Sequence, residues 1–183
     1  MSKALDQITP ELADWVAKQS IFFVGTAPLS AAGHVNISPK GGDSFRVLGP
    51  LEVVYQDYTG SGAETAAHLR ENGRIVIMFC AFDGPPRIAR LHGHGTIIRP
   101  GDKRFDELSS RFPQNAGTRA VIHVSVTRVS TSCGYAVPFF DFRQPRDQLD
   151  RWANTKGPEE LAAYRMEKNS QSIDGLPAFT DES

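Results

Sequence analysis

Six β-like runs, joined mostly by short turns, restrict the fold of this chain more than any other feature. They are rich in β-branched and aromatic residues and are bounded by glycine, proline or polar residues, as strands are. No strand–helix–strand rhythm repeats along the chain, as it would in a parallel sheet. The runs are expected over residues 21–27, 35–38, 47–55, 74–82, 87–99 and 120–129. We therefore predict a mainly β fold, an antiparallel barrel or sandwich with a few covering helices.

Several helices are expected around these strands. Thr9 and Pro10 are typical of an N-cap followed by proline at the first helical position, and predict a helix that ends near Gln19. Pro39 should end the second strand, and Pro50 places the third strand at an edge or a bulge. Further helices are predicted over residues 102–112, 145–154 and 158–169, the last two being separated by Lys156-Gly157-Pro158.

The segment from Asp57 to Arg74 leaves a strand, turns through Thr59-Gly60-Ser61-Gly62 and continues as a helix that Gly73 would end. Such a turn offers free backbone N–H groups, small hydroxyls and the positive end of a helix dipole, which together suit an anion such as a phosphate. It is not a P-loop, because the Gly-Lys-Ser/Thr ending is missing. An ordinary strand–turn–helix connection explains the same residues, so both interpretations stay open at this point.

Length and charge limit the classes of protein to consider. The 183 residues fit one domain with an appended arm. The net charge of -1, with both signs mixed along the chain, argues against nucleic-acid and membrane partners. No apolar run approaches the roughly 20 residues of a membrane span, and the N-terminus lacks the apolar centre of a secretory signal. Cys80 and Cys133 are far apart and form no redox pair, so we expect a cytoplasmic protein with reduced thiols.

The composition changes at about Gln144. The segment beyond it carries few apolar residues, namely Leu149, Trp152, Leu161 and Tyr164, which are too few for a core of their own. We therefore predict two parts: a barrel over residues 1–143 and a C-terminal helical arm over residues 144–183. The arm should pack on the barrel or on a partner subunit.

Five segments, taken together and in order, resemble the FMN-binding split-barrel family named after pyridoxamine 5'-phosphate oxidase. They are Phe22–Ala27, Gly33–Gly41, Thr59–Arg74, Met78–Phe82 and Pro86–Gly93. The likeness is greatest to the oxidase-related, FMN-binding branch of this family. The resemblance implies a six-stranded antiparallel split β-barrel. It also implies a homodimer with FMN at the subunit interface.

The resemblance also implies a set of cofactor-binding residues. The candidates are Ser38, Lys40, Thr59, Ser61, Gly62 and Thr65 for the phosphate and ribityl end of FMN, and Arg90 for the flavin of the partner subunit. From the residues alone, Lys40 fits a solvated lysine equally well, and Arg90 fits a charge on the barrel surface. No metal site is expected, because His92 and His94 share a strand face without an evident third ligand.

Two departures from the oxidase itself bear on the substrate. The oxidase carries Ser-Arg-Lys at the helix start, whereas this chain has Ala63-Glu64-Thr65, which removes two positive charges and adds a negative one. The oxidase also has an Arg-Leu-x-Pro element near its end, whereas Leu176-Pro177 here has no arginine nearby. Pyridoxamine phosphate is therefore not the expected substrate.

The resemblance implies an FMN-dependent oxidoreductase that passes hydride between flavin N5 and an unknown small-molecule substrate or electron donor. Such chemistry needs no dedicated nucleophile or acid–base residue, and the sequence displays none. The alternative is a flavin-binding or carrier protein without turnover. A related split barrel that uses a deazaflavin or haem is a third hypothesis.

Overall fold

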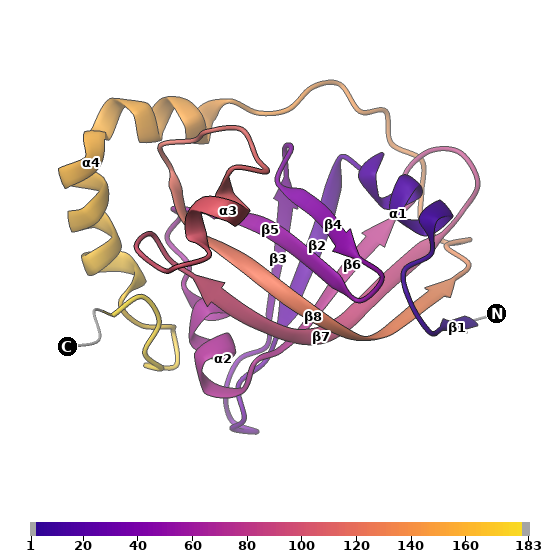
Figure 1. Ribbon diagram of the computed structural model, residues 1–183, viewed down its shortest axis with the longest axis horizontal. Coiled ribbons are helices and arrows are strands. Elements are labelled where there is room, and N and C mark those ends of the chain that lie inside the picture. The colour runs from indigo at the N-terminus through magenta and orange to yellow at the C-terminus, as the bar shows by residue number, and fades with distance from the viewer. Residues whose placement is uncertain (1–2, 181–183) are drawn as a thin grey trace.

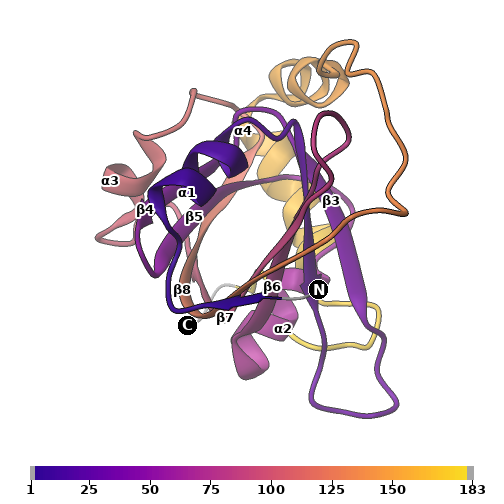
Figure 2. The same cartoon turned by 90° about the vertical axis from the view of Figure 1, so that its right-hand side faces the viewer.

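The computed structural model describes residues 3–180, which form one curled antiparallel sheet with covering helices (Figures 1 and 2). The described part of the sheet has eight strands in the order β3-β2-β6-β7-β8-β5-β4, and β1 pairs with β8. The strands are β1 (Lys3–Leu5), β2 (Ile21–Thr26), β3 (Asn36–Gly41), β4 (Phe45–Gly49), β5 (Glu52–Tyr58), β6 (Arg74–Cys80), β7 (Ile88–Ile98) and β8 (Thr118–Ser132). The predicted mainly β, antiparallel architecture is confirmed.

The sheet departs from the prediction in strand number and at two prolines. The single strand expected over residues 47–55 is a hairpin of β4 and β5, because the chain turns at Pro50, whose carbonyl accepts a hydrogen bond from Ile8 N. The short strand β1 was not predicted either, so the sheet has eight strands among the described residues instead of six. Pro39 lies inside β3 rather than at its end. An edge strand such as β3 pairs on one side only, which makes a proline tolerable there.

The helices follow the local signals closely. Helix α1 (Pro10–Ala17) is capped by Thr9, whose Oγ1 accepts a hydrogen bond from Leu12 N at 3.3 Å. Helix α2 (Glu64–Asn72) ends at Gly73, which has the positive φ of 72° that favours glycine. Helix α3 (Phe105–Ser109) is shorter than predicted. Within residues 3–180, no helix combines the length and apolar character that crossing a membrane requires.

Side chains close the gap between the two ends of the curled sheet. The terminal strands β3 and β4 share no backbone ladder in the described chain. Instead, the Phe22 and Phe45 rings meet inside the barrel with centroids 5.2 Å apart. Lys40 of β3 also forms a 2.9 Å ion pair with Asp57 of β5. The barrel is therefore split along its backbone and joined through its interior, as the open ring of strands in Figure 2 makes visible.

Helix α4 (Gln148–Asn169) runs along one end of the barrel, and the tail after it packs beside α2 on the same chain (Figure 1). The helix is interrupted at Gly157, with φ 71° and ψ 170°, at the break expected from the sequence. Farther on, Asp174 accepts a hydrogen bond from His34 N at 2.8 Å. Phe179 lies beneath the Arg119 guanidinium at 4.7 Å. The C-terminal segment thus contacts its own barrel, while the division of the chain at residue 143 stays a prediction.

Candidate functional site

The turn between β5 and α2 is held firmly at its first residue and is open after it. Thr59 is fully buried, and both its backbone N and its Oγ1 donate to the Gly117 carbonyl, at 2.7 and 2.8 Å. Ser61 and Gly62 are exposed. The N-cap position of α2 is Ala63, which makes no side-chain capping bond. Because the first N–H groups of a helix have no intrahelical acceptor, this turn presents backbone donors at the positive end of the α2 dipole.

A buried ionic cluster lies directly behind the turn. Asp57, 3% exposed, accepts hydrogen bonds from Lys40 Nζ at 2.9 Å and Arg119 Nε at 2.7 Å. Burial alone would raise the pKa of the Asp57 carboxyl, but the charges and hydrogen bonds of Lys40 and Arg119 outweigh it and lower that pKa. Arg119 Nη1 also donates to the Gly62 carbonyl at 2.9 Å. Arg119 therefore links the barrel interior to the turn.

Helix α4 adds a further cation to the turn. Arg165 Nε donates to Thr59 Oγ1 at 2.8 Å, and its Nη2 donates to the Thr118 carbonyl at 3.2 Å. Burial and the neighbouring charge of Arg119 lower the pKa of the Arg165 guanidinium. Asn169, on the same helix, donates from Nδ2 to the Gly60 carbonyl at 2.8 Å. The C-terminal helix thus braces the turn at two points.

A second polar network lies on the other side of the α2 start. Asn36 Nδ2 donates to Thr65 Oγ1 at 3.0 Å and to Thr26 Oγ1 at 3.2 Å. Asn36 Oδ1 accepts a hydrogen bond from Ser38 Oγ at 3.2 Å. Behind it, Thr26 Oγ1 lies 2.9 Å from Nδ1 of the buried His68. This network connects β3 to α2 through hydroxyl and amide groups.

The structure groups most of the predicted cofactor-binding residues around the start of α2. Thr59, Ser61 and Gly62 form the turn, and Lys40 lies behind it. Ser38 and Thr65 meet through Asn36. Their roles in binding FMN stay predictions.

Arg90 lies apart from this group. It belongs to β7, which is separated from β3 by β2 and β6, and its Nη1 donates to Ser132 Oγ at 3.2 Å. In the sheet register, Arg90 pairs with Met78 and Ser130. A single chain does not bring Arg90 to the α2 start, so its predicted contact depends on a partner subunit.

Sequence reasoning missed Asp57, Arg119 and Arg165 as members of this site. Asp57 stands two residues before the turn, just after the strand predicted over residues 47–55. Arg119 immediately precedes the strand predicted over residues 120–129 and belongs to no motif, and Arg165 lies on a predicted helix among several other charged residues. Only the tertiary fold brings these two arginines to the turn.

Apolar surface and two cavities surround the site. Val35, just before β3, and Ile37, on β3, are 72% and 70% exposed. A cavity of about 340 Å³ lies between the start of β8 and the interruption of α4, and Thr118, Gly157 and Arg165 are among the residues that line it. No residue of the turn at 59–62 lines this cavity.

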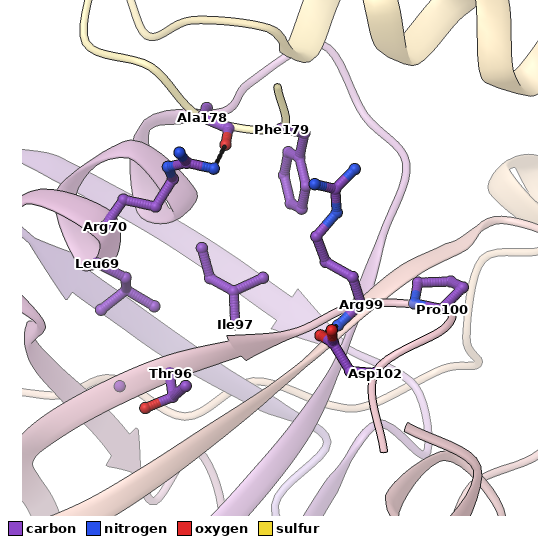
Figure 3. A pocket seen from close by; sticks show the side chains of 10 residues that line it. Leu69, Arg70, Thr96, Ile97, Arg99, Pro100, Asp102, Ala178 and Phe179 are labelled. Atoms are coloured by element: carbon purple, nitrogen blue, oxygen red, sulfur yellow. Dashed lines mark hydrogen bonds between the residues drawn. The ribbon is translucent and has the colours of Figure 1, made fainter. Parts of the chain in front are cut away.

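A larger cavity, of about 580 Å³, lies at the other end of α2 (Figure 3). There, Arg70 Nη1 donates to the Ala178 carbonyl at 3.1 Å, and the Phe179 ring forms one wall. None of the predicted cofactor-binding residues lines this larger cavity. Within the described chain, His, Cys, Asp and Glu side chains form no group of three or more that could hold a metal ion.

The fold and this site define a small split antiparallel barrel in which an uncapped turn with cations behind it begins a helix. The family model of pyridoxamine 5'-phosphate oxidase matches residues 8–133. A relative that is 42% identical carries the same family name. The chain belongs to the pyridoxamine 5'-phosphate oxidase family.

That relative is the pyridoxamine 5'-phosphate oxidase family protein ustO of Aspergillus flavus, and the match covers 95% of this chain and 76% of ustO. Among solved structures, HupZ of Group A Streptococcus is 26% identical with a TM-score of 0.51, over 67% of this chain and 91% of that one. The FAD binding protein of Mycobacterium smegmatis is 13% identical with a TM-score of 0.50, over 71% of this chain and 98% of that one. At that identity, the likeness concerns the fold alone.

Proposed function

We propose that this protein binds FMN with the phosphate at the start of α2 and acts as an oxidoreductase on a small molecule. The observation that carries the proposal is the uncapped turn at Ser61 and Gly62, with Arg119 and Arg165 behind it, in a member of the pyridoxamine 5'-phosphate oxidase family. Family membership supports flavin binding in general. We choose FMN because the positive charge and the free N–H groups of the site suit a phosphate group.

The net charge of the site suits the phosphate of this cofactor. Lys40, Arg119 and Arg165 carry three positive charges against two negative charges on Asp57 and Glu64, which leaves one in excess. The α2 dipole adds roughly half a positive charge at the same point. A phosphate monoester carries about -1.5 to -2 at neutral pH, which this positive charge largely balances.

The rest of FMN would extend along β3. Ser38, Asn36 and Thr65 offer hydroxyl and amide groups suited to the ribityl chain. Val35 and Ile37 offer an exposed apolar wall for the flat ring. Lys40 contributes through its charge, because its Nζ is already paired with Asp57.

Bound FMN would supply hydride exchange at flavin N5. The residues of this chain would bind and orient the cofactor and shield it from water. Pyridoxamine phosphate is not the proposed substrate, because Leu176-Pro177 stands without the arginine of the Arg-Leu-x-Pro element that the oxidase carries near its end. The proposed substrate is a different small molecule.

The proposal includes a homodimer with the flavin at the subunit interface. Exposed aromatic side chains after β8, namely Tyr135, Phe139, Phe140 and Phe142, are 61% to 83% exposed in the single chain. A second copy would cover such a surface. The same arrangement would bring Arg90 to the flavin held by the other subunit.

The competing proposal is a flavin carrier without turnover, which flavin binding by itself supports equally well. Anaerobic mixing of the FMN-loaded protein with NADH or NADPH, followed at the flavin absorption band, separates the two. Reduction within seconds, followed by reoxidation by an added acceptor, supports the oxidoreductase. A flavin that stays oxidised with both donors, and with a panel of small-molecule donors, would favour the carrier.

A further inference from the structure

The geometry points to Arg165 of the C-terminal helix as a ligand of the cofactor phosphate, so that bound FMN fastens the C-terminal arm onto the barrel. This inference rests on the proposed FMN site and extends it to a residue outside the part of the chain that the family model matches.

The second half of α4 is a separate helical segment. The helix is interrupted at Gly157, so residues 158–169 form a separate segment against the barrel. Two side chains of this segment reach the turn: Arg165 contacts Thr59 Oγ1, and Asn169 contacts the Gly60 carbonyl. The segment that holds Arg165 is thus set directly on the turn that would receive the phosphate.

Charge is unbalanced at this contact. Arg119 is paired with Asp57, but within residues 3–180 Arg165 has no carboxylate partner. Burial and, after it, the repulsion from the Arg119 guanidinium lower the pKa of Arg165. A dianion between the arginines would reverse the repulsion, because a guanidinium binds phosphate oxygens strongly and with fixed geometry.

Arg165 keeps unused donors for such a ligand. Its hydrogen bonds to Thr59 and Thr118 use only part of the five N–H donors of a guanidinium. The exposed Ser61 and Gly62 lie on the same turn as Thr59.

The test compares FMN with riboflavin, which has the same ring and ribityl chain and lacks the phosphate. Arg165→Ala should weaken FMN binding by about 10- to 100-fold, the usual effect of losing one charge-assisted hydrogen bond. Riboflavin binding should change by less than about twofold, since no phosphate is involved. Arg165→Lys should recover part of the loss by restoring charge without the planar fork. Arg151→Ala is the matched control, because Arg151 is an exposed arginine of α4 that pairs only with Asp147.

Equal losses of FMN and riboflavin affinity in Arg165→Ala would overturn the inference and leave the FMN site standing, because Arg165 would then only support the fold. Unchanged FMN affinity would overturn it too. A wild-type protein that binds neither flavin would instead overturn the proposed function, and the inference with it.

Hydrogen exchange gives a second readout that needs no activity. In the wild-type protein, FMN should slow amide exchange in residues 158–169, whereas riboflavin should not. Protection by millimolar inorganic phosphate as well would assign the site to phosphate of either source, and protection by FMN alone would assign it to the cofactor. Equal protection by FMN and riboflavin would contradict a role for the phosphate in fastening the arm.

Discussion

Replacing Asp57 by asparagine should lower the free energy of unfolding of the barrel. The substitution should also make that free energy less dependent on pH. The Asp57 side chain is 3% exposed and holds Lys40 and Arg119, whose side chains are 20% and 6% exposed. Removing the carboxylate leaves two cations near each other without their counter-charge. It also weakens the contact between β3 and β5, which helps to close the split between the ends of the sheet.

The expected loss is about 3 to 5 kcal/mol in the free energy of unfolding, the range for breaking a buried ion pair by removing one partner. The lower end applies if Lys40 turns its ammonium to water, as its partial exposure permits. For a chain of this size, each kcal/mol lowers the melting temperature by about 2 to 4 °C, so the drop should lie between about 6 and 20 °C. Calorimetry and urea unfolding at pH 7 would measure it.

The pH dependence provides the sharper test. The pKa of Asp57 is lower in the folded chain than its ordinary value of 3.8, so its contribution is present above that value and is lost as the pH falls toward the folded-state pKa. The wild type should therefore lose more stability than Asp57→Asn between pH 5 and the acid transition. Asp43→Asn is the control, because the Asp43 carboxylate is 65% exposed and pairs with Arg46 at the surface. A destabilisation by Asp57→Asn no larger than that of Asp43→Asn, expected to be below about 1 kcal/mol, would refute the account of the cluster.

Three further changes test the site. Glu64→Gln should tighten FMN binding several-fold and leave riboflavin binding unchanged, since it removes a negative charge from the proposed phosphate seat; equilibrium titration with both flavins measures this, and weaker FMN binding would contradict it. Lys40→Ala combined with Ser61→Ala should weaken FMN retention with an unchanged circular dichroism spectrum, because Arg119 still pairs with Asp57; unaltered FMN affinity would remove both residues from the site. Truncation before Gln144 should reduce flavin retention or dimerisation, as light scattering and absorbance would report, and a truncated protein that stays dimeric and yellow would refute that role of the arm.

The fold was predictable from local signals, and its exceptions have local causes. The Thr9 cap, the Gly73 helix end and the Gly157 break each act over a few residues, and all occur where the sequence places them. The hairpin of β4 and β5 was missed because Pro50 is compatible with an edge strand or a bulge as well as with the turn that it forms. The edge position of β3, which allows Pro39 inside it, depends on the order of the whole sheet.

The candidate site was predictable only in part, for a related reason. The turn at residues 59–62 could be predicted because its glycine and hydroxyl residues are adjacent in the chain. The two arginines behind the turn are distant from it in the sequence. Arg119 is 62 residues from Asp57, and Arg165 is 106 residues from Thr59. No spacing rule connects such residues, so their convergence could be learned only from the folded chain.

Whether this barrel carries FMN is decided by the absorption spectrum of the purified protein. The spectrum should show the two visible bands of an oxidised flavin, and the chromophore released by denaturation should have the mass of FMN. A deazaflavin spectrum or mass would contradict the choice of cofactor. A colourless protein that also fails to bind added FMN would contradict FMN binding itself.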